Sequence, residues 1–322
     1  MSDMLELRDG PPWAMEEMIL AEPALVAPIL ASPAAVEAAE SIREGGPVVL
    51  VGCGTSEHAA MAGAALLEGA TARDAFEASL DPQQGGVCIA ISHEAGTAAT
   101  LKALDAAKRN GARTILITAK PDLVTADIVI ATPLVDTSWC HTVGYVSPLL
   151  ALTAIAGAAD EETCYRVIDE NLARRDGFAA AAGVLADAER LITVGSGIDE
   201  ITARELALKI EEGTHVPTTP LGMEKVLHGH LPAADEHTGI VVIRAHPGAE
   251  RDRRAEDVLA AAEVLGMPSV LLDGLPQGHP LLAGAIAAQL LTLELVHAHG
   301  TNPDLIRREE PTYKAAADAA NT

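Results

Sequence analysis

Continuous runs of apolar residues alternate with helical patterns along most of the chain. Runs such as VVLVG (48–52) and VCIAI (87–91) are rich in β-branched side chains and lack the polar alternation of a half-exposed strand. A helical pattern follows each turn, as in AATLKALDAAKRNG (98–111). Such an order is typical of a parallel sheet that is buried on both faces. It therefore predicts an α/β fold of the doubly wound, flavodoxin-like type.

This pattern occurs twice. The segment GGPVVLVGCGTSEHAAMAGAALLEGA (45–70) has a counterpart in ERLITVGSGIDEITARELALKIEEG (189–213), each an apolar run, a G-x-G and a helical pattern. Further strand–turn–helix–strand segments and a long apolar helix follow in the same order in both halves. We therefore predict two tandem domains, each with a mostly parallel five-stranded sheet between helices.

The two halves set the predicted domain boundaries of the chain. We predict an N-terminal helical segment over 1–44, interrupted at its prolines, a first domain over 45–170 and a second domain over 171–300. The polar residues 301–322 follow the last apolar helix and form a separate tail.

Composition narrows the class of protein. The chain has 322 residues, of which 49% are hydrophobic, and a net charge of −24, which disfavours nucleic-acid and anionic-membrane partners. Its four cysteines lack the paired spacing of a metal site, so we expect reduced thiols and no metal. The N-terminus lacks a secretory signal, and we expect no stretch of the ~18 apolar residues that a membrane span needs. These features predict a soluble, cytoplasmic protein.

Two turns that follow apolar strands are candidate anion sites. The first, CGTS (53–56), places Thr55 and Ser56 at the start of a helix, where N–H groups and hydroxyls are free to donate. Without a full G-x-G-x-x-G or a P-loop lysine, it is a poor nucleotide site, and Thr55 or Ser56 could instead simply cap the helix. The second turn, SHEAGT (92–97), contains a carboxylate, Glu94, in its middle.

These turns, their order and the second G-x-G resemble the sugar isomerase (SIS) family. The resemblance covers about residues 15–315. It extends to the isomerase half of glucosamine-6-phosphate synthase and to related phosphosugar isomerases, deaminases and deglycases. The printed sequence begins at the sugar-binding half, so we do not expect a complete glutamine-dependent synthase.

In that family the two turns bind a sugar phosphate. The resemblance implies that the residues that match or replace this cradle bind the substrate: Gly54, Thr55, Ser56, Ser92, His93, Glu94 and Thr97. Glu94 replaces a serine, and like charges ~4 Å apart repel by several kcal/mol at an effective dielectric near 20. Unless Glu94 faces solvent or pairs with His93, the substrate therefore carries something other than an ordinary phosphate at this end.

A third family stretch corresponds to DTSWCHTVGY (136–145). Thr142 matches the family pattern, Trp139 and His141 are additions, and a valine replaces the usual lysine. Trp139 is a candidate platform for a sugar ring or a core aromatic. His141 either orients a sugar hydroxyl or caps the following helix.

The candidate catalytic residues lie in the second half. Glu205, Lys209 and Glu212 share one side of a predicted helix by their i, i+4 and i+7 spacing. The resemblance implies that Glu212 is the base and that Lys209 polarises the oxygen of the developing enediolate. It also implies that His228 opens the sugar ring. A solvated ion-pair stripe is the alternative for the helix. Neither a metal nor a cofactor is needed for this chemistry.

The tail resembles a family loop that closes over the sugar. Arg307 lies at nearly the family spacing, and Lys314 lies about three residues beyond the position of the family's lysine. The resemblance also implies a homodimer or higher homo-oligomer, because the histidine loop usually completes the site of the neighbouring subunit.

We therefore expect an aldose–ketose isomerase of a sugar or modified sugar. An amino-sugar phosphate deaminase or a fructosamine deglycase is the alternative on the same scaffold. A sugar-binding regulator without catalytic activity is the alternative from another class.

Overall fold

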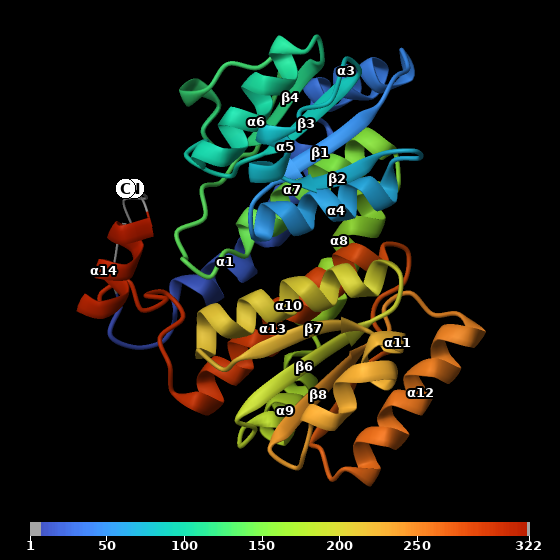
Figure 1. Ribbon diagram of the computed structural model, residues 1–322, viewed down its shortest axis with the longest axis vertical. Helices are drawn as coiled ribbons and strands as arrows, with labels where there is room; N and C mark the ends of the chain where they lie inside the picture. The colour runs from blue at the N-terminus through green and yellow to red at the C-terminus, as the bar shows by residue number, and fades with distance from the viewer. Residues whose placement is uncertain (1–7, 321–322) are drawn as a thin grey trace.

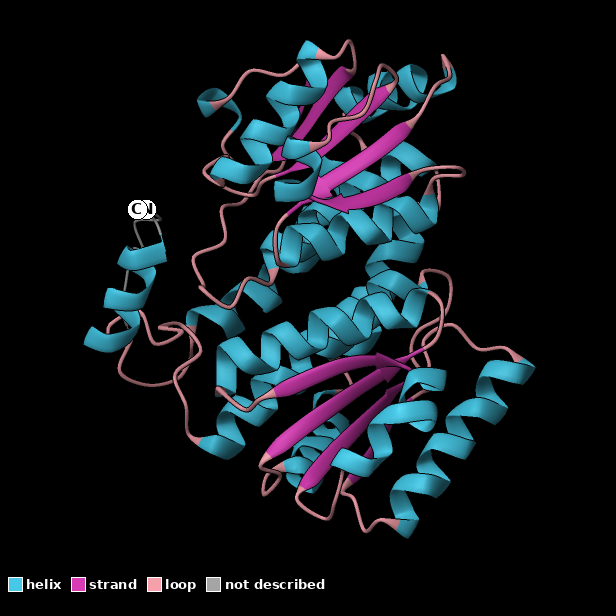
Figure 2. Cartoon of the chain, in the orientation of Figure 1, coloured by secondary structure: helices cyan, strands magenta, loops and turns pink. Residues whose placement is uncertain are grey.

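The computed structural model describes residues 8–320 and contains one parallel sheet in each half of the chain (Figures 1 and 2). The first sheet has the strand order β2-β1-β3-β4-β5. All of its paired strands are parallel. Its strands are β1 (Val48–Gly52), β2 (Thr71–Asp74), β3 (Val87–Ile91), β4 (Arg113–Thr118) and β5 (Ile128–Ala131). The predicted five-stranded parallel sheet of the first half is confirmed.

The second sheet has four strands in the described part of the chain, in the order β7-β6-β8-β9. Its strands are β6 (Arg190–Gly195), β7 (Thr218–Gly222), β8 (Thr238–Ile243) and β9 (Ser269–Leu272). The prediction of a fifth strand here is wrong. After β9 only residues 273–279 precede the long helix α13 (Pro280–His299), whereas β5 lies in the longer connection between β4 and α7 (Val143–Ala156). The first four strands of both sheets nevertheless share one order.

Helices cover both faces of each sheet, as the continuous apolar strands predict. Helices of the first half are α4 (Thr55–Leu66), α5 (Ala75–Leu80), α6 (Ala98–Arg109) and η2 (Pro121–Leu123), together with α7. Those of the second half are α8 (Glu161–Leu172), α9 (Arg175–Leu185), α10 (Ile198–Thr214), α11 (Met223–Lys225), the π-helical segment η3 (Val226–His230), η4 (Leu231–Ala233) and α12 (Ala249–Val264), together with α13. Buried strand residues on one face contact α5 and α6 in the first half, and α12 in the second.

The largest apolar cluster joins the two halves. It extends from the N-terminal helices through α7 to α13, and α10 packs against both α13 and α4. Figure 1 shows α4 and α10 lying side by side between the two sheets. The N-terminal helices α1 (Ala14–Ala21), η1 (Glu22–Leu25), α2 (Val26–Leu30) and α3 (Pro33–Arg43) pack on α7 or α13 or both. At the other end, α14 (Pro311–Ala320) lies fully exposed on the tail.

Helix α13 corrects the expectation about apolar stretches. By length and composition it could cross a membrane, with a mean hydropathy of 1.6, but 83% of that stretch is buried inside this structure. Its apolar character follows from its position, because α8, α9 and α10 pack around it. The N-terminal helices pass the same test only if Ala14–Leu30 and Pro33–Arg43, bent by 60°, are taken as one span.

Candidate active site

A cleft of about 410 Å³ lies where the loops of the first half face helix α10 of the second. The turns after β1 and β3, the segment before α7, α10 and the tail all contribute to it. We refer to it below as the cleft. It is lined by Cys53, Gly54, Thr55, Ser56, His93, Glu94, Gly96, Thr97, Trp139, His141, Gly144, Leu208, Glu212 and Arg308. Nine of the sequence-predicted site residues are among these: Gly54, Thr55, Ser56, His93, Glu94, Thr97, Trp139, His141 and Glu212.

The first turn has the geometry of an open helix N-terminus. Gly54 is the N-cap residue of α4 with a φ of 57°, and no side chain caps this helix end. The alternative that Thr55 or Ser56 is a capping residue is therefore wrong. Gly52 is required by a close approach, because a Cβ there would lie 2.3 Å from the carbonyl oxygen of Ser56. The Thr55 hydroxyl donates to Oε1 of Glu205 across the interface between the halves, at 3.4 Å.

The second turn places its residues at different depths. Ser92 is buried beneath the turn and does not line the cleft, whereas Thr97 is exposed on it as the N-cap residue of α6. Its hydroxyl makes no capping hydrogen bond. The second turn therefore offers Thr97, and not Ser92, to a ligand in the cleft.

Glu94 lies in the cleft and forms an ion pair with Lys120. The Lys120 ammonium, which follows β4, lies 2.9 Å from Oε2 of Glu94. The sequence left open whether Glu94 faces solvent or pairs with His93, and the structure shows a different partner. Because β3 and β4 are neighbouring parallel strands, their carboxyl ends bring Glu94 and Lys120 together. The negative charge in the anion cradle is thus locally compensated.

Asp136 organises the segment before α7. Its buried carboxylate accepts hydrogen bonds from the backbone N–H groups of Ser138, Thr142 and Gly144 and from the Ser138 hydroxyl, at 2.6–2.9 Å. Thr142 is fully buried and lies outside the cleft, and its carbonyl oxygen accepts a hydrogen bond from the Gln289 amide. Thr142 therefore supports the segment, and the structure does not present it to a ligand.

Two histidines lie close together in the cleft, with ring centroids 5.9 Å apart. Nε2 of His93 accepts a hydrogen bond from the backbone N–H of Asp136 at 2.8 Å, and burial lowers the His93 pKa to about 4. Nδ1 of His141 lies 3.7 Å from a carboxylate oxygen of Asp136. Burial opposes the charged form of His141, but the nearby negative charge of Asp136 outweighs it and raises the His141 pKa. At neutral pH the two rings therefore differ: His93 is neutral, and His141 is the more basic.

The tail contributes Arg308 to the cleft. Its guanidinium carbon lies 3.5 Å from the Trp139 ring centroid, so one face of the predicted sugar platform is covered by a cation. The predicted Arg307 lies outside the cleft, where it contacts Glu310 and the ring of Tyr313, and Lys314 is exposed on α14. The prediction for the tail was thus one residue away from the arginine that lines the cleft.

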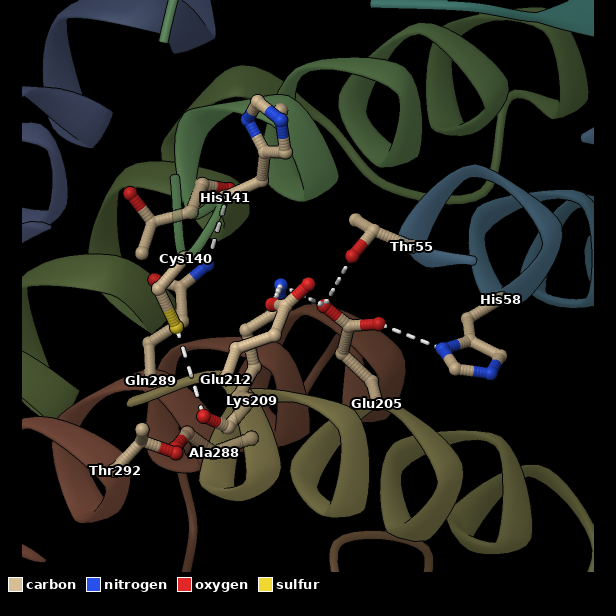
Figure 3. A network of polar contacts seen from close by, with 12 residues as sticks. Thr55, His58, Cys140, His141, Glu205, Lys209, Glu212, Ala288, Gln289 and Thr292 are labelled. Carbon is tan, nitrogen blue, oxygen red and sulfur yellow. Dashed lines mark hydrogen bonds and ion pairs between the residues drawn. The ribbon is translucent and has the colours of Figure 1, made fainter. Parts of the chain in front are cut away.

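The predicted catalytic helix carries a buried ion cluster, formed by Glu205, Lys209 and Glu212 of α10 (Figure 3). Lys209 is fully buried, with its ammonium 2.6 Å from Oε2 of Glu212 and 3.7 Å from Oε1 of Glu205. Glu205 is also buried and lies 2.7 Å from Nδ1 of His58 on α4. Of the three, only Glu212 lines the cleft. A solvated ion-pair stripe is therefore excluded, and Lys209 lies behind the base instead of facing a ligand.

The charges of this cluster support one another. Burial opposes ionisation of Lys209, but the Glu212 and Glu205 carboxylates hold its pKa above the usual value. Burial likewise opposes ionisation of Glu205, yet the charge of Lys209 and the hydrogen bond from His58 keep its pKa low. The Lys209 ammonium therefore stays charged behind Glu212, the member of the cluster that lines the cleft.

His228 lies outside the cleft of its own chain. It belongs to the π-helical segment η3, its side chain is 74% exposed, and Nδ1 lies 3.0 Å from a carboxylate oxygen of Glu224. The structure thus does not bring His228 together with Glu212 within one chain.

Four residues at this site were missed by the sequence interpretation: His58, Lys120, Asp136 and Arg308. Asp136 opens the segment that was matched to the family, but its hydrogen-bonding role is visible only once the segment folds around it. Lys120 follows β4 as Glu94 follows β3, which is the one signal that could have predicted their contact.

Comparison with known proteins now adds to this geometry. Residues 41–156 match the SIS domain family, so the predicted resemblance is confirmed for the first half. That match does not reach the second half, where a second SIS domain stays a prediction. The chain is 27% identical over 316 residues to the isomerising glutamine–fructose-6-phosphate aminotransferase of Thermococcus kodakarensis, covering 83% of this chain. The chain spans about half of that relative's length (52%).

Solved structures support the fold over nearly the whole chain. The C-terminal domain of glucosamine-fructose-6-phosphate aminotransferase from Francisella tularensis has a TM-score of 0.80 at 20% identity, covering 93% of this chain and 99% of that one. The tagatose-6-phosphate ketose/aldose isomerase of Escherichia coli has a TM-score of 0.77 at 17% identity, with 94% and 98% covered. At these identities the likeness establishes the architecture and not the activity.

Proposed function

We propose that this protein is an aldose–ketose isomerase of a sugar phosphate and that Glu212 is its base. The observation that carries the proposal is the position of Glu212 in a cleft of about 410 Å³, with buried Lys209 directly behind its carboxylate. The names of the relatives support a substrate of this class, since they include fructose-6-phosphate and a ketose/aldose isomerase.

The base must be ionised and aimed at the substrate. Isomerisation transfers a proton from one carbon to its neighbour through an enediolate, and one carboxylate can perform both transfers. The Lys209 ammonium lies 2.6 Å from Oε2 of Glu212, while the 23% exposure of the Glu212 side chain leaves it open to a ligand. Lys209 acts in this proposal as a positioning residue. The polarisation of the substrate oxygen, which was first predicted for Lys209, is therefore assigned to another group.

The anion cradle is compatible with a phosphate. Thr55, Ser56 and Thr97 lie at the N-termini of two helices, where backbone N–H groups and hydroxyls favour an anion. The ion pair with Lys120 removes most of the repulsion that Glu94 was expected to cause. Arg308 adds a cation to the cleft, where the charges of Glu212 and Glu94 act on it. We therefore assign a phosphorylated sugar, plain or modified, to this cleft.

His228 fits a site shared between subunits. It is exposed on the second half, whereas its predicted task lies in a cleft that it does not reach in its own chain. We propose a homo-oligomer in which this histidine completes the site of a neighbouring copy, as the family resemblance implied.

Two other functions use parts of the same site. A deaminase or deglycase would use the same base on an amino sugar and would release ammonia or an amine. A regulator would bind the sugar without turnover. It would not need a carboxylate in the cleft with a buried lysine behind it, as Glu212 and Lys209 provide.

Solvent-exchange NMR tests the proposal. The full chain is incubated in D2O with aldose, ketose and amino-sugar 6-phosphates and with the same sugars lacking phosphate. The proposal expects deuterium at the carbon beside the carbonyl for a phosphorylated sugar, together with conversion to its isomer. Ammonia release favours the deaminase, and binding without exchange favours the regulator. Exchange with the unphosphorylated sugars alone contradicts the substrate assignment.

A further inference from the structure

We propose that His141, positioned by Asp136, is the acid–base residue that exchanges protons with the substrate oxygens while Glu212 works on carbon. This inference rests on the proposed isomerase and assigns a catalytic role to a residue at which the family resemblance offers none. It also answers a question that the buried position of Lys209 leaves open, namely which group protonates the enediolate oxygen.

The imidazole of His141 has one anchored edge and one open edge. Nδ1 is buried and lies 3.7 Å from the Asp136 carboxylate, whereas 30% of the side chain is exposed. The ring edge that carries Nε2 is therefore the one available to the cleft. Gly144 lies against the same ring, because a Cβ at this position would come within 3.2 Å of Nδ1. Asp136 and Gly144 thus lie on the Nδ1 side of the ring, and a side chain at position 144 would displace the ring.

Other groups near the cleft are less suited to this proton transfer. His93 accepts a backbone hydrogen bond at Nε2 and has a pKa of about 4, so it is not protonated at neutral pH. Lys209 is fully buried behind Glu212, and the Arg308 guanidinium does not lose its proton. His228 does not reach the cleft of its own chain.

Charged groups around His141 come from several elements. Asp136 lies beside it in its own segment, and Lys209 and Glu212 act on it from α10 with opposite signs. The neutral His93 ring faces it from the turn after β3, and Arg308 lies on Trp139 two positions away along the chain. Asp136 is the nearest of the charged groups, and it favours the protonated ring. His141 and Glu212 both line the cleft, His141 from the segment before α7 and Glu212 from α10.

The reaction balances with these two residues. The Glu212 carboxylate takes the proton from C2, the C2–H electron pair forms the C1=C2 bond, and the carbonyl π pair moves to O1. O1 takes the proton from Nε2 of His141, which leaves a neutral ring and an enediol. The neutral ring then takes the proton from O2 as the C2 carbonyl forms. Glu212 returns its proton to C1, so both residues end as they began.

A pH profile tests the assignment. The basic limb of kcat/KM should report the deprotonation of His141 in the free enzyme. We expect His141→Gln to lower kcat by about 10²–10⁴-fold with little change in KM and to lose this limb. Asp136→Asn should move the limb to lower pH, because it removes the carboxylate that favours the protonated ring. His93→Gln is the matched control, and whatever its effect on KM, the limb should stay in place.

Chemical rescue separates catalysis from structure. His141→Ala opens space beside the cleft, so added imidazole should restore turnover in proportion to its concentration. Replacing it with 4-methylimidazole, which is more basic, should move the restored limb upward. Glu212→Ala should show no such rescue. If His141→Gln keeps the basic limb, or if imidazole does not restore His141→Ala, the assignment is wrong, provided that circular dichroism shows both variants to be folded.

Failure of the proposed isomerase gives a different result. In that case the wild-type protein itself shows no solvent exchange with any sugar phosphate. An NMR titration of the histidine rings then still tests the geometry on which the inference rests. A His141 pKa above that of a free histidine and above that of His93 supports it, and a His141 pKa at or below the free value overturns it. If only the role of His141 is wrong, the wild-type protein is active and His141→Gln keeps the basic limb of the pH profile unchanged.

Discussion

Replacement of Lys209 by methionine should destabilise the protein strongly, although it removes a single surface-type residue from a helix. Lys209 has no exposed side-chain area, and it holds two carboxylates, Glu205 at 3.7 Å and Glu212 at 2.6 Å. Glu205 is itself only 1% exposed, so it cannot recover hydration when its partner is lost. The methionine side chain fills a similar volume, which isolates the effect of charge from that of a cavity.

The magnitude follows from the geometry. Two unit charges 3.7 Å apart attract by about 4 kcal/mol at an effective dielectric of 20. Breaking a buried pair by removing one partner costs about 3–5 kcal/mol, because the remaining charge stays buried without compensation. Hydrogen bonds from His58 and Thr55 to Glu205 remain and favour the lower half of this range. We therefore expect Lys209→Met to lower the free energy of unfolding by about 3–4 kcal/mol at pH 7.

Urea unfolding with two companion variants measures this effect. The double variant Lys209→Met with Glu205→Gln should regain most of the loss, because neither ion then stays buried alone. Lys225→Met is the matched control, since this 57% exposed lysine lies 2.8 Å from Glu200 and such a surface pair contributes about 0–1 kcal/mol. In Lys209→Met, the folded-state pKa of Glu205 should rise above its unfolded value. The variant should therefore recover this lost stability as the pH falls from 7 through the raised folded-state pKa of Glu205, and the recovery should be complete near pH 4, where the unfolded state is protonated as well. A loss under about 1 kcal/mol, or a double variant less stable than the single one, would refute the reasoning.

Three further predictions concern the cleft. Glu212→Gln should abolish solvent exchange while circular dichroism and thermal unfolding show an intact fold, and full exchange would remove Glu212 as the base. Lys120→Met should weaken the binding of a sugar 6-phosphate about tenfold, as seen by calorimetry, because it removes a positive charge 2.9 Å from Glu94 and so leaves the cradle more negative. Glu94→Ser should strengthen the same binding, and unchanged affinities in both variants would contradict the cradle assignment. Arg308→Ala should raise KM for the phosphorylated sugar and Arg307→Ala should not, since only Arg308 lines the cleft; equal effects would argue against this difference.

The strands and the first turn could be predicted because each of their sequence patterns is compatible with only one local structure. The runs at β1 and β3 are apolar at every position, and both sheet faces there are covered. Gly52 and Gly54 mark a turn that no residue with a Cβ could make without strain or a close contact, and this turn is found where the sequence places it. Local chemistry was sufficient in both cases.

Burial around the predicted catalytic helix could not be derived from its spacing. The i, i+4, i+7 pattern puts Glu205, Lys209 and Glu212 on one side of α10, but a stripe of charges normally faces water. What buries Lys209 and Glu205 is the contact of α10 with α4 and α13, which is a tertiary fact. For a related reason the sequence indicated Arg307 whereas Arg308 lines the cleft: the tail has no periodic pattern that fixes which side chain turns inward.

The buried position of Glu205 determines how the two halves work as one site. The anion cradle belongs to the first half and the base to the second, so their separation depends on how α4 sits on α10. Glu205 of α10 receives hydrogen bonds from Thr55 and His58 of α4, and its other neighbour is Lys209, the residue that holds Glu212. Any opening between these helices would expose a carboxylate and an ammonium that are now fully paired. The distance from cradle to base is therefore set by this contact.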